Sequence, residues 1–339
     1  MRTLVYVSCG DDKQIVVFEM DRGTGMLGEL SRTDVPGTSE PSPSSLPLAI
    51  SPDRRFLYAA LRTAPFPVST FAIDPASGGL RHAGLAALPD SMCYLSTDHA
   101  GKRLFSASYG GAKLGVSAIV DGIAGEVIQV VSTPPKAHSI RPDPEGRFVY
   151  AACLGGDVIL AQRFDGAALD RTPNPAARTR PGAGPRHFAF ARTSARLYCV
   201  NELDGTVNAY DRDAASGALR EIQSVSALEH GVSGSAAAAD VHLTPDDRFL
   251  YASVRSTDTL AGFRADPATG RLTLIGHVTS EPTPRGFAIE PQGKFLLCAG
   301  MASGGVATYA IDPDTGALER RGAAHAGAGA NWVEVVEFG

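Results

Sequence analysis

The chain has 339 residues, a formal net charge of -5 and a sequence pI near 5.9. This balance argues against a nucleic-acid or anionic-membrane partner, because both favour a basic protein surface. No apolar stretch approaches the roughly 20 residues that span a bilayer, and the five cysteines stand singly, so we expect reduced thiols in a cytoplasmic protein.

A turn signature, Asp-x-x-Ser/Thr-Gly-x-Leu, recurs along the whole chain. Five copies are clear and two weaker ones fill the gap in the middle. In chain order the copies start at Asp21, Asp74, Asp121, Asp165, Asp213, Asp266 and Asp312. Successive copies lie 44 to 53 residues apart. A period of this length, with alternating apolar runs and no helical periodicity, is typical of a β-propeller.

A second repeated feature is a strand of the type Arg-Phe-Leu-Tyr, seen at residues 55–58 and 248–251 after Pro-Asp turns. The first copy, residues 2–6, lacks a preceding strand, and residues 332–338 supply one from the other end of the chain. We therefore predict an all-β fold. It is a seven-bladed β-propeller, a single domain over 1–339, closed by pairing the N- and C-terminal strands in one blade.

Three segments depart from the blade pattern. They are rich in Pro, Ser, Gly or Ala and cover residues 37–45, 173–185 and 229–239. Such composition is typical of loops, so we expect them to lengthen connections between strands.

Polar residues stand where each blade should begin with a small or apolar innermost strand. Aligned repeats place four of them at one level of the ring and three at the next: His138, Arg186, Arg285 and Asn331, then Ser139, His187 and Asp240. His242 points the same way as Asp240 by strand alternation. Buried polar groups cost free energy unless they are partnered, so such a cluster indicates function. Capping of a loop or pairing with a structural carboxylate remains the alternative for any single residue.

The loop after the second strand of each blade lies on the same face as the start of the innermost strand. It contributes Arg62, Tyr109, Glu202 and Arg255. Arg binds carboxylate or phosphate through two hydrogen bonds, while Glu and His can transfer protons. We therefore predict a pocket for an anionic, oxygen-rich small molecule. No metal-ligand motif and no cofactor-binding motif is found, so we expect neither group.

Three stretches carry a family resemblance: GAGPRH at 182–187, YCVNEL at 198–203 and AADVH at 238–242. Together they resemble the seven-bladed propeller lactonases, which include bacterial 6-phosphogluconolactonases and fungal carboxy-cis,cis-muconate lactonizing enzymes. The resemblance implies a metal-free site at one mouth of the propeller. Its working groups would be His138, Glu202, Arg186 and either Arg255 or Arg285.

Two departures from that pattern concern positive charge. The chain has no Arg-Trp pair before AADVH and no second Arg shortly after Arg62. The substrate could therefore be 6-phosphogluconolactone or an unphosphorylated aldonolactone. The expected activity is metal-independent hydrolysis of a sugar-acid lactone by general acid/base catalysis. A muconate-type cyclase and a non-catalytic interaction platform remain alternatives, and the sequence leaves the oligomeric state open.

Overall fold

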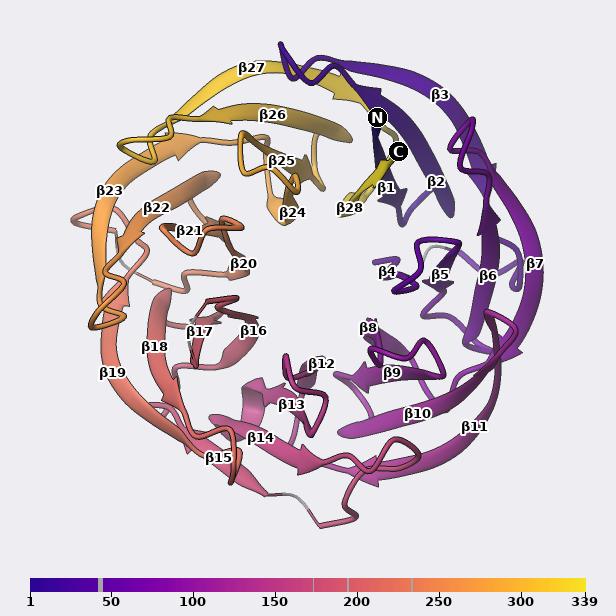
Figure 1. The fold of residues 1–339 in the computed structure, drawn as a ribbon, viewed down its shortest axis with the longest axis horizontal. Coiled ribbons are helices and arrows are strands. Elements are labelled where there is room, and N and C mark those ends of the chain that lie inside the picture. The colour runs from indigo at the N-terminus through magenta and orange to yellow at the C-terminus, as the bar shows by residue number, and fades with distance from the viewer. Residues whose placement is uncertain (42–44, 173, 194, 233) are drawn as a thin grey trace.

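Seven four-stranded antiparallel sheets form a closed ring, as seen in the computed structural model (Figure 1). The structure describes residues 1–41, 45–172, 174–193, 195–232 and 234–339. The predicted all-β, seven-bladed propeller is confirmed.

Each sheet runs outward from an innermost strand at the centre of the ring. The first sheet contains β28 (Ala330–Phe338), β1 (Arg2–Cys9), β2 (Gln14–Met20) and β3 (Leu27–Asp34). The second contains β4 (Leu48–Ile50), β5 (Phe56–Ala60), β6 (Pro67–Ile73) and β7 (Leu80–Ala87). The third contains β8 (Met92–Thr97), β9 (Arg103–Ser108), β10 (Lys113–Val120) and β11 (Ile123–Ser132).

The remaining four sheets follow the same order. The fourth contains β12 (Ala137–Pro142), β13 (Phe148–Cys153), β14 (Val158–Arg163) and β15 (Pro175–Arg178), with the short 3-10 helix η1 (Leu154–Gly156) between β13 and β14. The fifth contains β16 (Pro185–Phe190), β17 (Arg196–Asn201), β18 (Thr206–Arg212) and β19 (Leu219–Ser226). The sixth contains β20 (Ala238–Leu243), β21 (Phe249–Val254), β22 (Thr259–Ala265) and β23 (Leu272–Thr279). The seventh contains β24 (Pro284–Ile289), β25 (Phe295–Gly300), β26 (Gly305–Ile311) and β27 (Leu318–His325).

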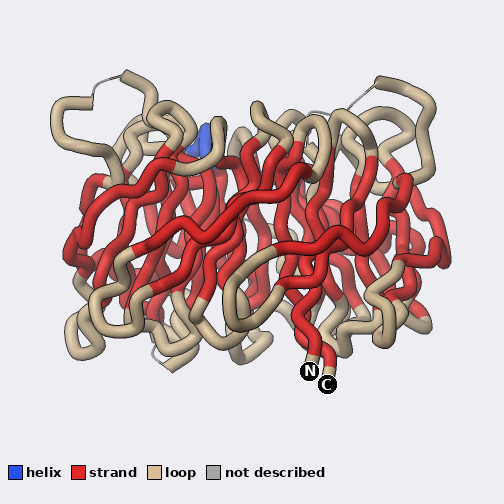
Figure 2. The backbone as a smooth tube through the Cα atoms, turned by 90° about the horizontal axis from the view of Figure 1, so that it is seen from above, coloured by secondary structure: helices blue, strands red, loops and turns tan. Residues whose placement is uncertain are grey.

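The two ends of the chain meet in one sheet. β1 pairs with β28 in antiparallel register from Arg2 opposite Phe338 to Ser8 opposite Trp332. Figure 2 shows the two termini side by side at one face of the ring. The predicted closure is confirmed, and it removes the open sheet edge that a gap in the ring would leave.

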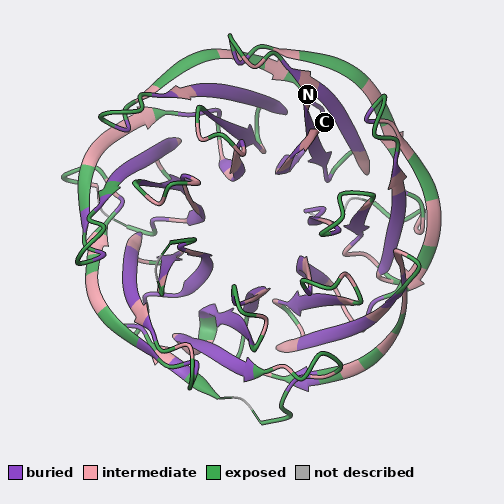
Figure 3. Ribbon diagram, in the orientation of Figure 1, coloured by how far each residue is buried: buried purple, intermediate pink, exposed green. Residues whose placement is uncertain are grey.

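The apolar core lies between the sheets. Among the described residues, buried apolar side chains form one cluster between each pair of neighbouring blades. The outermost strands instead alternate between partly buried and exposed residues, as the outer rim in Figure 3 shows. This alternation follows from the two faces of a strand, only one of which packs against a neighbour.

The repeated turn signature has a local cause. The Asp21 carboxylate accepts hydrogen bonds from the backbone N–H groups of Gly23 and Thr24 and from the Thr24 hydroxyl. Gly25 follows with a φ of 78°, and a Cβ there would lie 2.7 Å from the Phe295 ring of the neighbouring blade. Asp, Thr and Gly are therefore needed for the turn and for close packing of adjacent blades.

One loop prediction was partly wrong. Within 173–185, residues 175–178 form β15, the outer strand of the fourth sheet. An outer strand tolerates Pro175 because one edge of it needs no hydrogen-bond donor. Parts of the three predicted loops, at residues 42–44, 173 and 233, lie outside the described residues.

Candidate active site

Six of the seven innermost strands have a backbone irregularity near their start. The pairing register shifts across Cys93 in β8, His138 in β12, Arg186 in β16 and Arg285 in β24, and it shifts again across Asn331 in β28. A β-bulge inserts one extra residue and redirects its side chain. The bulges therefore explain why polar side chains at these positions leave the sheet plane and project toward the axis of the ring.

A cavity of about 210 Å³ lies at this end of the channel. Bulged strands and the loops after β5, β9, β17 and β21 contribute its lining side chains: Arg62, Cys93, Tyr109, His138, Arg186, Glu202, Arg255 and Arg285. We call this cavity the upper pocket. All five side chains predicted as catalytic line it, together with Arg62 and Tyr109.

The carboxylate of Glu202 lies between two guanidinium groups. Its Oε2 accepts a hydrogen bond of 2.7 Å from Arg186 Nε and lies 3.1 Å from Arg255 Nη2. Arg186 is 1% exposed and also donates to the carbonyl of Ala239, while Arg255 Nε donates to the Ala237 carbonyl at 2.7 Å. These contacts hold both arginines in one orientation, as a preorganised electrostatic site requires.

Arg285 differs from the other arginines because no hydrogen bond or ion pair holds its guanidinium among the described residues. Burial, followed by the positive charges of Arg186, Arg255 and Arg62, lowers the pKa of Arg285 to about 9. Burial and the charge of Arg186, partly offset by Glu202, lower the pKa of Arg255 to about 10. The upper pocket is therefore strongly electropositive, and an anion would relieve the repulsion among its cations.

His138 is the imidazole of the upper pocket. It is 5% exposed and contacts Tyr109 edge-to-face, with the ring centroids 5.8 Å apart. Burial lowers the pKa of His138 well below its usual value, and the charges of Arg186, His187 and Arg285 act in the same direction. His138 is therefore neutral at neutral pH and can accept a proton.

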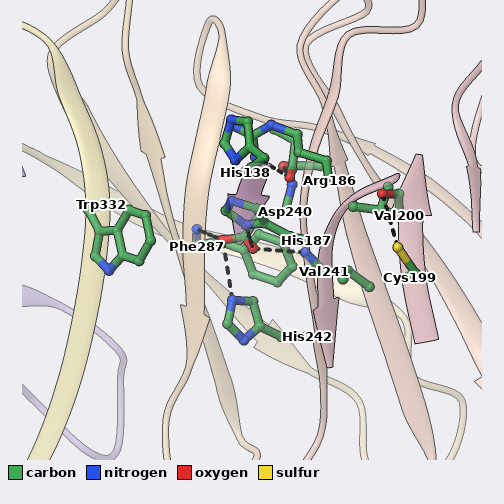
Figure 4. Close-up of polar contacts among 12 residues, drawn as sticks. His138, Arg186, His187, Cys199, Val200, Asp240, Val241, His242, Phe287 and Trp332 are labelled. Atoms are coloured by element: carbon green, nitrogen blue, oxygen red, sulfur yellow. Dashed lines mark hydrogen bonds and ion pairs between the residues drawn. The ribbon is translucent and has the colours of Figure 1, made fainter. Parts of the chain in front are cut away.

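Five predicted substrate-binding residues lie outside the upper pocket. Asn331 accepts a hydrogen bond from Leu46 N at 3.1 Å and donates to Gly329 O at 2.6 Å, so it links β28 to the segment before β4. Ser139 is fully buried. The other three, His187, Asp240 and His242, form a hydrogen-bonded group deeper in the channel (Figure 4). The repeat alignment predicted that these residues would join the others in one pocket. It gives the position of a residue along its strand, but it does not show toward which cavity a bulge directs the side chain.

A second cavity, the lower cavity, opens at the other end of the innermost strands. It has a volume of about 470 Å³ and contains His187, Asp240 and His242 in its wall, beside Trp332 and Glu334. Burial raises the pKa of Glu334, whose Oε1 accepts a hydrogen bond from Trp332 Nε1 at 2.9 Å. Titratable side chains therefore line both the upper pocket and the lower cavity.

Sequence reasoning missed two residues near the upper pocket. Cys93 lines it because the bulge in β8 falls one residue later than the repeat alignment placed it. Lys136 Nζ lies 5.5 Å from the centre of the Tyr109 ring, directly before the strand that carries His138. Lys136 stands two residues before His138 in the sequence, and this position could have indicated that it lies near the upper pocket.

Two further findings concern other kinds of site. In the described ranges, no group of three or more His, Cys, Asp or Glu side chains is arranged to hold a metal ion. None of the described helices is long and apolar enough to cross a membrane.

Comparisons with known proteins identify the family to which the chain belongs. A family model described as "Lactonase, 7-bladed beta-propeller" matches residues 4–335. A 6-phosphogluconolactonase of Pectobacterium carotovorum is 41% identical over 339 residues, with 99% of each chain covered, and one of Serratia proteamaculans is 36% identical with the same coverage. The structure of a periplasmic gluconolactonase of Pseudomonas aeruginosa is 26% identical, with 100% of both chains covered and a TM-score of 0.90. The chain belongs to the seven-bladed β-propeller lactonase family.

Proposed function

We propose that this lactonase hydrolyses a phosphorylated sugar-acid lactone of the 6-phosphogluconolactone type in the upper pocket. The observation that carries the proposal is the charge of the pocket: it has four arginines and one carboxylate, and that carboxylate contacts Arg186 and Arg255. Arg285 and the neighbouring Arg62 supply further positive charge. A phosphate group suits planar guanidinium donors, which bind its oxygens in pairs.

The proposed reaction begins with His138 as general base. It accepts a proton from water while the water oxygen bonds to the lactone carbonyl carbon. The carbonyl electron pair moves to oxygen, where Arg186 and Arg255 stabilise the negative charge. The bond between the carbonyl carbon and the ring oxygen then breaks, and His138 returns its proton to that oxygen. The carboxylic acid product finally loses a proton to solvent.

The contacts favour His138 over Glu202 as the base. Glu202 Oε2 already accepts from two arginines, so the lone pairs of that oxygen are directed at guanidinium groups and not at a substrate water. His138 lines the same pocket and is neutral, and no carboxylate forms an ion pair with it among the residues that the structure describes. We therefore assign Glu202 the role of holding Arg186 and Arg255 in place.

The first test is hydrolysis of fresh 6-phosphogluconolactone beside glucono-1,5-lactone, with EDTA present and spontaneous opening subtracted. We expect a strong preference for the phosphorylated lactone and no loss of rate with EDTA. A preference for glucono-1,5-lactone would contradict the phosphate proposal, and loss of activity with EDTA would contradict the metal-independent mechanism. If neither lactone is opened, lactonization of a muconate-type dicarboxylate is the next reaction to assay, and its absence would leave a non-catalytic role.

Arg285→Ala tests the phosphate contact directly. A hydrogen bond to a charged group contributes about 1.5–3 kcal/mol, so KM for the phosphorylated lactone should rise about ten- to hundredfold. KM for glucono-1,5-lactone should change far less. Arg81→Ala, on the exposed outer strand β7, is the control. An equal rise in KM for both lactones would show that Arg285 does not bind the phosphate.

We also propose a cytoplasmic location. All five cysteines are free and buried, which suits a reducing compartment. The Pseudomonas relative is named as periplasmic, so cell fractionation would decide between the two compartments.

A further inference from the structure

Asp240 is the centre of the hydrogen-bonded group below the upper pocket (Figure 4). Its Oδ1 lies 2.8 Å from His187 Nδ1 and accepts from Val241 N at 3.0 Å. Its Oδ2 lies 3.2 Å from His242 Nε2 and accepts from Phe287 N at 3.2 Å. Burial alone would raise the pKa of Asp240, but His242 and His187 lower it well below the usual range. A buried carboxylate with this many donors is fixed in place and remains ionised.

Two imidazole nitrogens nearby have no hydrogen-bond partner. His138 Nδ1 and His187 Nε2 are both buried and unpaired among the described residues. The two rings lie close together, with centroids 5.1 Å apart and planes inclined by 59°. Buried polar atoms are rarely left unpaired in native proteins, so this pair requires an explanation.

Both rings border a small void of about 10 Å³ between the two cavities. Its other walls are Ser45, Cys93, Arg186, Arg285, Asn331 and Trp332. A space of this size is about the minimum that holds one water, provided that polar groups face it. The void and the two unpaired nitrogens therefore fit a single bridging water.

Asp240 determines the direction of its hydrogen bond with His187. Because an ionised carboxylate only accepts, His187 must carry its proton on Nδ1, which leaves Nε2 as an acceptor. The water then donates one hydrogen to His187 Nε2. Toward His138 Nδ1 it can either donate its second hydrogen or accept, and the accepting arrangement places the His138 proton on Nδ1 and leaves the free lone pair on Nε2.

We propose that Asp240 and His187, acting through one water in the void, fix the tautomer of His138 so that its Nε2 is the general base in the upper pocket. Asp240 and His187 are thus positioning residues and do not bind substrate. The catalytic part of this inference rests on the proposed function, whereas the assignment of the His138 tautomer does not.

The tautomer can be measured without any substrate. In protein with ¹⁵N-labelled histidine, the ¹⁵N chemical shifts of His138, assigned with a His138→Gln variant, distinguish Nδ1–H from Nε2–H. We expect Nδ1–H in the unsubstituted protein at neutral pH. Finding the Nε2–H form there would overturn the proposal, even if the protein proved to have another activity.

Two substitutions at His187 form a matched pair. The Gln amide can donate to Asp240 with its nitrogen and accept from the water with its oxygen, whereas Phe can do neither. His187→Phe should release the His138 tautomer and lower kcat on the order of a hundredfold, with KM little changed. His187→Gln should keep Nδ1–H on His138 and retain most of kcat.

A purely structural role for His187 predicts a different result. Both variants would then lower kcat to the same extent, and His138 would keep Nδ1–H in both. That outcome would overturn the proposal. If His187→Phe fails to fold, the tautomer in the unsubstituted protein and in His187→Gln still decides the question.

Discussion

Glu202 shows how two neighbouring charges constrain a single side chain. Its carboxylate is 19% exposed and contacts Arg186, whose side chain is 1% exposed. Glu202→Gln would leave that buried guanidinium without a counter-charge. Removing one partner of a buried ion pair costs about 3–5 kcal/mol, so we expect urea unfolding to show a loss near the lower end of this range.

Glu29→Gln is the control for this prediction. Glu29 pairs with Arg32 on an exposed strand, and exposed pairs contribute about 0–1 kcal/mol. A similar loss of stability in both variants would mean that the Glu202 pair is not effectively buried. The Glu202→Gln variant should also lose most of its kcat, because Arg186 and Arg255 lose their common anchor.

The pH dependence follows from the two buried histidines. Burial, then the charge of Arg186, lowers the pKa of His187 to about 4, although Asp240 opposes the shift. The pKa of a histidine in the unfolded chain is about 6.5. Between these values the unfolded chain binds more protons, so stability should fall as the pH is lowered from about 6.5 to about 4. Urea unfolding across this range tests the sign, and the fall should be smaller in His187→Phe.

The catalytic rate should also fall when the pH is lowered far enough. The base must be unprotonated, so kcat/KM should stay level from neutral pH down past 6.5 and decline only at the lowered pKa of His138. The titratable and charged groups around His138 and its pocket are Tyr109, Cys93, Arg62, Arg186, His187, Glu202, Arg255 and Arg285. A decline centred at 6.5 or higher would contradict the assignment of His138 as base.

At the scale of the strand, tyrosines link five of the seven blades to the next blade. The hydroxyl of a tyrosine in the second strand donates to the glycine carbonyl of the neighbouring blade's repeated turn. Five such pairs are Tyr6–Gly78, Tyr58–Gly122, Tyr150–Gly217, Tyr198–Gly270 and Tyr251–Gly316, with distances from 2.7 to 3.1 Å. The two repeated sequence features are therefore the two halves of one interblade contact.

Tyr251→Phe removes one of these contacts without changing the packing of the ring. The buried Gly316 carbonyl loses its donor, so the free energy of unfolding should fall by about 1 kcal/mol. Tyr210→Phe is the matched control, because the buried Tyr210 hydroxyl has no partner in the part of the chain that the structure describes. Urea unfolding that gives equal losses for both variants would show that the interblade hydrogen bond contributes nothing.

At the scale of the whole molecule, stability depends on closing the ring. β28 supplies an innermost strand, and its Val333 and Val336 are buried against the two neighbouring blades. Deleting residues 330–339 would open the first sheet and expose these clusters, so we expect loss of cooperative unfolding and aggregation. Thermal unfolding with light scattering would measure both effects.

A circular permutant is the control for the deletion. It joins residue 339 to residue 1 by a short linker and opens the exposed turn at Ala268, far from the seam. This protein keeps β28 and should unfold cooperatively. A deleted protein with an unchanged unfolding transition would contradict the role of closure.

The repeat itself was readable from the sequence because the turn chemistry is local. The Asp21 carboxylate accepts hydrogen bonds from the backbone and the hydroxyl of Thr24, and Gly25 adopts a positive φ. Because these requirements lie within a few residues, the same residue types recur wherever the turn recurs. Seven copies then determined the number of blades and the pairing of the two ends. The prediction of a loop at residues 175–178 was wrong because an outer strand can form from many residue types.

The sequence also determined which strand starts carry polar residues, but only the tertiary structure decided which of these residues meet. Arg186 and His187 are adjacent in the chain, yet Arg186 lines the upper pocket and His187 the lower cavity. Arg186 is the extra residue of the bulge in β16, and a bulge is a property of paired strands that no single strand's pattern records. The contacts of Glu202 with Arg186 and Arg255 likewise depend on three strands from two blades, whose distances are set by packing around the whole ring.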